Sequence, residues 1–346
     1  MGELWDRVDH LLDRANGGVD DLLEHRVHLL AAQGWRAWGQ PVPPRVADEE
    51  RSAALRTLAV PLVLERVRAA YDGPLLLLKG AEAAASYRDP FLRPFKDLDL
   101  LVPDAGAAQK ALVASGFKPV GNPDLYLEIH HERPLWLPGQ PLMVEIHREP
   151  KWPGGLAPPS AAELFESAVP SAVGAEGVLA LPPGAHAVVL AAHSWAHEPL
   201  RRLIELIDVA ALVQHADRAE LVGFARRWGV ERIWRTTLAA SDSLLGSDGP
   251  LTWPLRLWAR NLPELRGRTV LESHVERWLA GYWARPPREA LREMGSAAAR
   301  EVSRAPGESW GAKLVRTRRA AANPFARRSE HDLEWRNEIE RLRGRR

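Results

Sequence analysis

The sequence predicts an α+β protein in which a small mixed sheet is flanked by helices. Short apolar runs bounded by turn residues, typical of buried strands, lie within residues 75–147, and helical periodicity dominates on both sides. A Pro- and Gly-rich stretch at 151–159 follows the strands. We therefore expect four regions. They are a helical N-terminal region (1–73), a core that carries the chemistry (74–150), a helical C-terminal domain (160–315) and a basic C-terminal tail (316–346).

Composition is that of an ordinary soluble globular protein. Of the 346 residues, 46% are hydrophobic and 26% charged, and 46 Lys and Arg against 45 Asp and Glu give a net charge of +1. This balance predicts no strong overall attraction to nucleic acid or membranes. The absence of cysteine excludes disulfides and thiol chemistry. Because no stretch has the layout of a signal peptide or the length of a membrane span, we expect a cytoplasmic protein.

The N-terminal region is expected to be helical. Apolar residues recur at helical spacing over 4–15, a pair of glycines interrupts the pattern, and a second helix covers 22–31. The sequence PVPP at 41–44 indicates a linker, after which a long helix is expected from Asp48 to Ala70. We interpret this region as a helical lead-in that packs on the sheet.

Two consecutive strands carry the strongest chemical signal. The apolar run Leu75–Leu78 predicts a buried strand that ends at a Lys-Gly pair, and a short Ala-rich helix follows. The backbone of Gly80 can approach an anion closely, and the N-terminus of a helix attracts negative charge. A second strand, Leu98–Val102, is entered through Asp97. The first of these strands therefore predicts a phosphate-binding turn.

The start of the second strand has the pattern of a metal site. Asp97 and Asp99 lie two residues apart, so their carboxylates leave the same face of the strand. Two like charges this close repel each other unless a cation lies between them. Oxygen ligands of this kind suit Mg²⁺ or Mn²⁺, which share their coordination with substrate phosphates. A metal site beside a phosphate-binding turn predicts a nucleotide site.

The order of strand, Lys-Gly, short helix, Arg, Asp-x-Asp and hydrophobic strand resembles the nucleotidyltransferase superfamily of the polymerase β type. More narrowly, the pattern KG...Y...R...DLDLLV resembles a bacterial family of nucleotidyltransferase proteins. The resemblance implies a polymerase β-type core and a metal-dependent transfer of a nucleoside monophosphate from an NTP to an acceptor hydroxyl, with release of pyrophosphate. Two features depart from the superfamily. Its usual Gly-Ser is Gly80-Ala81 here, and the gap from Gly80 to Asp97 is longer than usual.

The same resemblance assigns roles to individual residues. In the superfamily a third carboxylate comes from a later strand, and the sequence VEIH in the expected strand 142–147 places Glu145 there, where Asp is more usual. The alternative is Glu128, which has the same local pattern in the expected strand 125–131. The three residues assigned to catalysis and metal binding are Asp97, Asp99 and Glu145. The five assigned to nucleotide contacts are Lys79, Gly80, Arg93, Lys96 and His147.

Beyond residue 160 we expect helices, and segment 192–208 resembles the helical region that follows the core in this family. His193 and His197 lie one helical turn apart, but the H-E-x-x-H order of zinc proteases is absent. We expect these histidines to play a structural role, such as bonding to Asp208, or to line an acceptor pocket. The expected helices cover 161–168, 185–198 and 200–215, and further helices extend to about 300.

The expected partners are an NTP and an acceptor that the sequence does not specify, whether a small molecule, a tRNA or a protein. The tail carries ten Arg against five Asp and Glu, which suits contact with nucleic acid, although a solvated helix has the same pattern. The Ala after Gly80 and the Glu at 145 favour, as an alternative function, a catalytically silent binding or scaffold protein of the same fold. The sequence predicts no oligomeric state.

Overall fold

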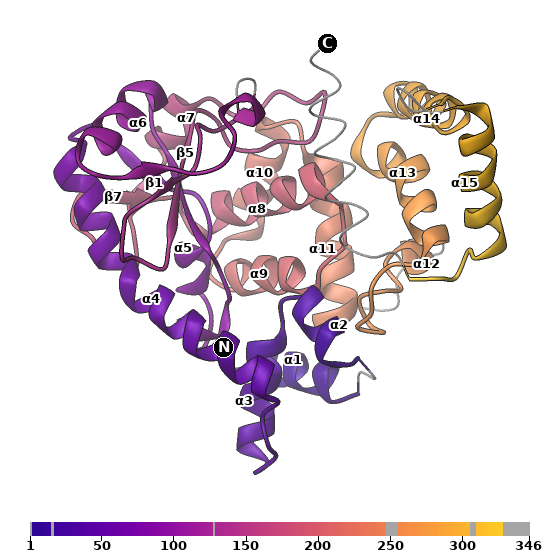
Figure 1. Ribbon diagram of the computed structural model, residues 1–346, viewed down its shortest axis with the longest axis horizontal. Coiled ribbons are helices and arrows are strands. Elements are labelled where there is room, and N and C mark those ends of the chain that lie inside the picture. The colour runs from indigo at the N-terminus through magenta and orange to yellow at the C-terminus, as the bar shows by residue number, and fades with distance from the viewer. Residues whose placement is uncertain (1, 15–16, 127–128, 247–254, 305–308, 328–346) are drawn as a thin grey trace.

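The computed structural model describes residues 2–14, 17–126, 129–246, 255–304 and 309–327. Within these ranges the chain forms an α+β fold, as the sequence predicts, with one mixed sheet of seven strands and helices on both of its faces (Figure 1). The order of the strands is β3-β4-β5-β2-β1-β7-β6. The N-terminal helices and the helices after residue 180 lie together on one side of this sheet.

The centre of the sheet is built from strands that are far apart in the sequence. β1 (Leu75–Leu77) pairs antiparallel with β2 (Asp97–Leu101) and parallel with β7 (Val178–Ala180). β2 in turn pairs parallel with β5 (Met143–His147). The remaining strands pair antiparallel at the two edges; they are β3 (Lys118–Pro119), β4 (Leu135–Trp136) and β6 (Val169–Pro170).

The two faces of the sheet belong to separate hydrophobic cores, because alternate residues of a strand point to opposite sides. On one face Leu77, Leu98 and Leu100 pack with residues of α4 (Pro44–Ala70) and α6 (Ala105–Ala114). On the other face Leu76 and Leu101 belong to the core formed with the helical part of the chain. Asp97 and Asp99 alternate with Leu98 and Leu100, so their side chains lie on this second face, between the sheet and the helices.

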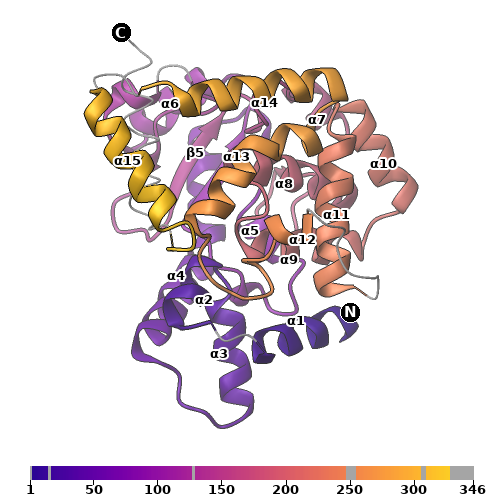
Figure 2. The ribbon, with the colours of Figure 1, turned by 90° about the vertical axis from the view of Figure 1, so that its right-hand side faces the viewer.

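The helices that cover this second face of the sheet come from both the N-terminal and the C-terminal parts of the chain. Its central helices α8 and α9 pack on each other and on α11, and the N-terminal α1 contacts both α9 and α11. α13 contacts α11 and α14, and Figure 2 shows α13, α14 and α15 on the side that faces the viewer, in front of this group. The N-terminal helices are α1 (Gly2–Arg14), α2 (Val19–Glu24) and α3 (His28–Ala37). The later helices are α7 (Ala161–Glu166), α8 (Pro183–His197), α9 (Leu203–Val213), α10 (Arg218–Arg227), α11 (Glu231–Leu245), α12 (Leu255–Trp258), α13 (Val270–Ala284), α14 (Pro287–Val302) and α15 (Trp310–Ala322).

Among the described residues of the predicted strand 125–131, only His131 pairs, through an isolated β-bridge, and the start of the predicted strand is wrong. Residues Pro123–Tyr126 form a short 3-10 helix instead. The proline fixes φ at the first position, and the side chain of Asn122 accepts a hydrogen bond from the backbone N–H of Asp124, which stabilises a turn in place of an extended strand. Glu128, the alternative third carboxylate, lies outside the described residues.

The expectation that the chain is purely helical beyond residue 160 is also wrong. β6 and β7 come from residues 169–180, and β7 lies directly beside β1. The predicted boundary near 151–159 therefore does not separate the sheet from the helical region. Near the N-terminus, the expected helix at 22–31 is divided into α2 and α3 because Arg26 has a φ of +57°, which no helix accommodates. Within the described ranges, no helix is long and apolar enough to cross a membrane.

Candidate metal centre

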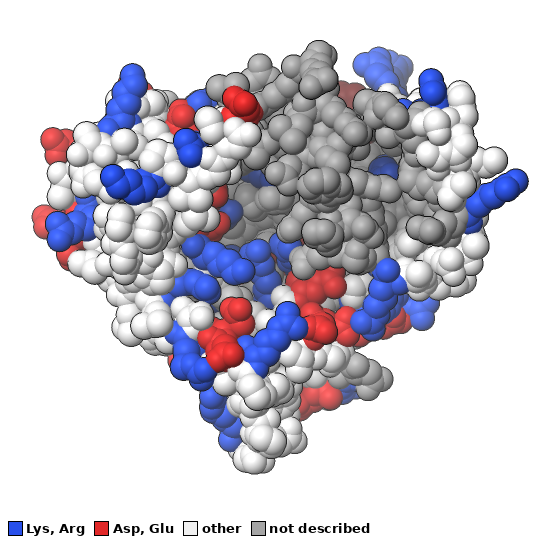
Figure 3. All heavy atoms as spheres, in the orientation of Figure 1, with Lys and Arg blue, Asp and Glu red and all other residues white. Residues whose placement is uncertain are grey.

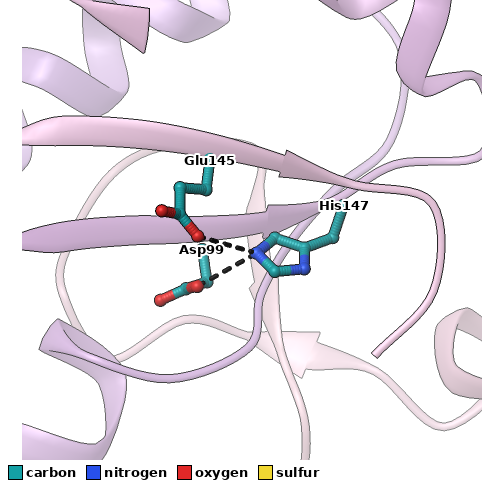
Figure 4. Close-up of side chains that lie close together, drawn as sticks. All are labelled: Asp99, Glu145 and His147. Atoms are coloured by element: carbon teal, nitrogen blue, oxygen red, sulfur yellow. Dashed lines mark hydrogen bonds and ion pairs between the residues drawn. The ribbon is translucent and has the colours of Figure 1, made fainter. Parts of the chain in front are cut away.

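The parallel pairing of β2 with β5 brings two distant carboxylates together. In this register Asp99 is the partner of Glu145, and Leu101 is the partner of His147. Alternation along each strand puts Asp99, Glu145 and His147 on the same face. Figure 4 shows their side chains converging, and one ligand atom of each lies within 4.8 Å of the other two. These residues are the one potential metal-binding group of Asp, Glu and His found among the described residues.

Asp99 is the centre of this group and is completely buried. Its Oδ1 lies 3.0 Å from His147 Nε2 and 3.1 Å from Lys79 Nζ. Burial alone would raise the pKa of the carboxyl, but the positive charges of Lys79 and His147 outweigh it and hold that pKa below its usual range. The second oxygen, Oδ2, is buried and has no hydrogen-bond partner in the described part of the chain. A buried carboxylate oxygen without a partner raises the free energy of the folded state, so this atom is suited to binding a metal ion.

His147 lies between the two carboxylates. Its Nε2 is 3.0 Å from Asp99 Oδ1 and 3.7 Å from Glu145 Oε2. Burial would lower the pKa of the imidazole, but the hydrogen bonds to Asp99 and Glu145 outweigh burial and raise it. The imidazole thus occupies a position between the two carboxylates.

Asp97 lies on the same face at the start of β2 but is not part of the group of three. Burial and the negative charge of Asp99 raise the pKa of its carboxyl to about 6, and the charge of Glu145 contributes in the same direction. Lys79 opposes this effect. Asp97 is therefore close enough to the cluster for its charges to affect the pKa of Asp97, as the Asp-x-Asp spacing predicts. Its carboxylate is not one of the three ligand groups that converge.

The Lys-Gly pair after β1 approaches this group from the neighbouring strand. Lys79 reaches Asp99, and the nearby carboxylates outweigh its burial and raise the pKa of its amine. Gly80 is buried and has a φ of +66°, and a Cβ atom here would lie 3.1 Å from the backbone oxygen of Asp97. The glycine therefore permits the turn after β1 to pack closely against the first residue of β2. Lys96 precedes β2 and its side chain is exposed.

Arg93 is held by a partner that the sequence argument did not give it. Its Nε and Nη2 each donate to the carboxylate of Asp208 at 2.7 Å, and its Nη1 donates to the backbone oxygen of Gly80 at 3.1 Å. Tyr87 donates a third hydrogen bond to Asp208 at 2.7 Å. Burial disfavours the charge of the guanidinium, but Asp208 outweighs burial and raises the pKa of Arg93. Arg93 thus joins the turn after β1 to helix α9.

Three histidines gather around the group, and sequence reasoning identified one of them. The ring centroids of His130, His131 and His147 lie between 4.8 and 5.4 Å from one another. His131 Nε2 is 3.9 Å from Glu145 Oε2. In the sequence, the two adjacent histidines that follow Glu128 are the feature that indicates them.

The predicted pair His193 and His197 lies on α8, with ring centroids 4.8 Å apart. They do not form the expected bond to Asp208, which is taken by Arg93 and Tyr87. Lys151 Nζ lies 2.8 Å from His197 Nδ1, and burial together with the charge of Lys151 lowers the pKa of His197 to about 2. Helix α8 packs in the core on the face of the sheet that also carries the metal group, and burial together with the charge of Lys79 lowers the pKa of both histidines.

Arg26 is a second group that the sequence did not single out. Its side chain is accessible to solvent, yet the surrounding protein desolvates it enough to lower the pKa of the guanidinium, with Arg202 contributing and Asp97 opposing. Figure 3 shows Lys and Arg gathered in a hollow at the centre of the molecular face, near the positions of α5 (Ala81–Ala84) and α9. Arg26 is thus close enough to Asp97 for the two charges to affect each other's pKa.

Comparison with known proteins gives one match. A family model described as "uncharacterised nucleotidyltransferase" matches residues 22–246, which is more than half of the chain and includes every strand of the sheet. Neither a curated protein nor a solved structure matches the sequence.

Proposed function

The chain belongs to a family of uncharacterised nucleotidyltransferases, and we propose that it is an active, metal-dependent enzyme of the polymerase β type. The proposed reaction moves a nucleoside monophosphate from an NTP to an acceptor hydroxyl and releases pyrophosphate. The observation that carries the proposal is the pairing of Asp99 with Glu145 on adjacent parallel strands, beside a buried oxygen of Asp99 that has no hydrogen-bond partner among the described residues. This arrangement is suited to a divalent cation, with Mg²⁺ or Mn²⁺ as the expected ions.

The donor atoms fit such an ion. Asp99 and Glu145 offer carboxylate oxygens on one face, and Asp97 adds negative charge at the start of the same strand. A bound divalent ion would lower the pKa of the acceptor hydroxyl and stabilise the leaving pyrophosphate. In this proposal Asp99 orients the reacting groups, because it is the carboxylate that the other members of the cluster contact.

The basic side chains around the carboxylates provide the proposed triphosphate contacts. Lys79 lies 3.1 Å from Asp99 and would neutralise phosphate charge next to the ion. Lys96 is exposed just before β2, and we assign it a similar role farther from the ion. Arg93 donates to Asp208 with two of its nitrogens, so we propose that it acts by holding the turn that contains Gly80. The acceptor would approach from the side of the sheet where His193 and His197 lie.

A second candidate function is a catalytically silent nucleotide-binding or scaffold protein. The observation that favours it is the ion pair of Lys79 with Asp99 at 3.1 Å, which together with His147 already neutralises the central carboxylate. The Ala that follows Gly80 also lacks the hydroxyl that is usual in the superfamily. The two functions differ in whether a divalent ion enters the cluster.

Nucleotide binding and pyrophosphate release test the proposal. The assay uses each labelled NTP with Mg²⁺ and with Mn²⁺, and compares the wild type with the variants Asp99→Asn and Asp48→Asn. Asp48 is an exposed residue of α4 that pairs with Arg51, so Asp48→Asn should behave like the wild type. Asp99→Asn should lose metal-dependent NTP binding by about tenfold or more. Labelled nucleotide can then identify the acceptor in a cell extract. If a folded wild type binds no NTP with any of these ions, the protein is not this enzyme.

A further inference from the structure

We propose that this site binds a first-row transition metal ion such as Mn²⁺ directly through histidine nitrogen. We also propose that the site binds Mg²⁺ less tightly. The inference rests on the proposed function, because it names the ion of the same site. It starts from the composition of the cluster, which contains two carboxylates and an imidazole in place of three carboxylates. Magnesium prefers oxygen ligands and retains its waters, whereas imidazole nitrogen is a common ligand of first-row transition metal ions.

His147 cannot be a bystander to an ion bound between Asp99 and Glu145. The ring is 2% exposed, and its Nε2 faces both carboxylates at 3.0 and 3.7 Å (Figure 4). Neighbouring ligands of an octahedral ion with bonds of about 2.1 Å lie about 3 Å apart. The separation from Asp99 matches this value and the separation from Glu145 is somewhat longer, so an ion between the carboxylates would reach the imidazole Nε2 after small side-chain rotations.

His131 supplies a second nitrogen with its lone pair in the required direction. Its Nδ1 lies 2.6 Å from the backbone oxygen of Glu132. A carbonyl oxygen only accepts, so Nδ1 carries the proton, and Nε2 carries the lone pair. This Nε2 lies 3.9 Å from Glu145 Oε2. A backbone bond from one ring nitrogen that leaves the other nitrogen free for the ion is the usual arrangement around protein-bound metals.

The fold holds this second histidine in place. His131 forms an isolated antiparallel β-bridge with His147, so its segment is fixed to the end of β5. The ring centroids of the two histidines are 5.2 Å apart. The orphaned Oδ2 of Asp99 supplies a further donor, which is buried and without a partner in the described residues. Asp99, Glu145 and His147 therefore form the ligand group, and His131 Nε2 lies next to it, 3.9 Å from Glu145 Oε2.

Binding of Mn²⁺ to the metal-stripped full-length protein tests the inference without any assay of turnover. We expect titration followed by the electron paramagnetic resonance of free Mn²⁺ to give an affinity at least about tenfold higher than that of Mg²⁺ in competition. The bound ion should show hyperfine coupling to ¹⁴N of imidazole. This coupling is measured on the wild type, so the result does not depend on the folding of any variant.

Variants then identify the nitrogen. His147→Asn should weaken Mn²⁺ binding by about tenfold to a hundredfold and remove the stronger ¹⁴N coupling, and His131→Asn should reduce the remaining coupling. His215→Asn, at an exposed histidine just after α9, is the matched control and should change neither. If Mn²⁺ binds without ¹⁴N coupling and no more tightly than Mg²⁺, the inference is overturned while the proposed enzyme stands. If neither ion binds with or without NTP, the proposed function fails as well.

Discussion

Two aspartates of the same strand face show how strongly the immediate surroundings of a residue set its chemistry. Asp97 and Asp99 are two residues apart, and burial penalises the charge of both. Asp99 lies within 3.1 Å of Lys79 Nζ and accepts a hydrogen bond from His147, so its pKa falls. The pKa of Asp97 rises to about 6 because burial and the charge of Asp99 dominate there. In the metal-free protein the negative charge of Asp97 is thus disfavoured, whereas that of Asp99 is stabilised by its neighbours.

This difference makes Asp97→Asn stabilising in the metal-free protein. The pKa of Asp97 is about 6 when folded and 3.8 as a reference, so the folded state holds the proton more tightly. Stability therefore falls as pH rises from about 4 to 6 and stays reduced above that. At pH 8 the Asp97→Asn variant should be more stable than the wild type by about 1–3 kcal/mol. At pH 5 this difference in the free energy of unfolding should be about 1 kcal/mol smaller.

Urea unfolding with a chelator present, at pH 5 and pH 8, measures this advantage. Asp48→Asn controls for the loss of one exposed negative charge. An advantage of Asp97→Asn that does not change between the two pH values would contradict the assignment. The same variant should lose affinity for a divalent ion, since the stabilising substitution removes the charge that the ion compensates.

Among the elements, helix α9 has a larger influence on the site than its place in the sequence suggests. Its Asp208 binds Arg93, which lies 115 residues earlier, and Arg93 also donates to the backbone oxygen of Gly80. Tyr87 completes the coordination of the carboxylate. The turn between β1 and α5 is therefore fixed from behind by a helix that contributes no ligand to the metal group.

Removal of Arg93 should destabilise the protein strongly. Arg93→Ala leaves the buried carboxylate of Asp208 with Tyr87 as its partner from this network, and an uncompensated buried charge costs about 3–5 kcal/mol. The matched control is Arg88→Ala, which removes a more accessible ion pair with Asp9 and should cost about 1 kcal/mol or less. Equilibrium unfolding in urea measures both. Equal losses for the two variants would mean that the Arg93 pair does not hold the turn.

The strands also show what could be predicted from the sequence. β2 and β5 each have five residues with clear alternation, so the faces of Asp99, Glu145 and His147 followed from spacing together with the resemblance. β7 has three residues, Val178–Ala180, and alternation cannot be recognised over so short a run. Its partner β1 lies about a hundred residues away, which local patterns do not reveal.

The surroundings of the site were harder to predict for a related reason. His131 reaches Glu145 through an isolated bridge, and Arg93 finds its partner on a later helix. Both contacts depend on how segments pack in three dimensions and on no regular spacing in the sequence. A motif therefore indicated which residues bear the chemistry, whereas their partners required the fold.

Across the whole molecule, neutral histidines are buried at points where distant parts of the chain meet. The pKa values of His25, His28 and His186 are each lowered to about 4, mainly by burial. His25 shows the structural reason. Its Nδ1 accepts from the backbone N–H of Leu203, and its Nε2 lies 2.9 Å from the backbone oxygen of Arg266, so one ring joins three regions of the chain. A charged imidazole in these places would have to be desolvated.

The protein should therefore lose stability in mild acid. A histidine with a pKa near 6.5 when unfolded and about 4 when folded binds its proton preferentially in the unfolded state, so stability falls as pH drops between these values. His28 gives the sharpest test because its ring is buried and makes no side-chain hydrogen bond in the described residues, so leucine can replace it at little cost. His28→Leu should match the wild type at pH 7 and exceed it by about 2 kcal/mol at pH 4.5. His10→Leu, at an exposed position of α1, should follow the wild type at both pH values in the same urea titrations. Parallel losses for wild type and His28→Leu would show that protonation of this buried ring does not drive acid unfolding.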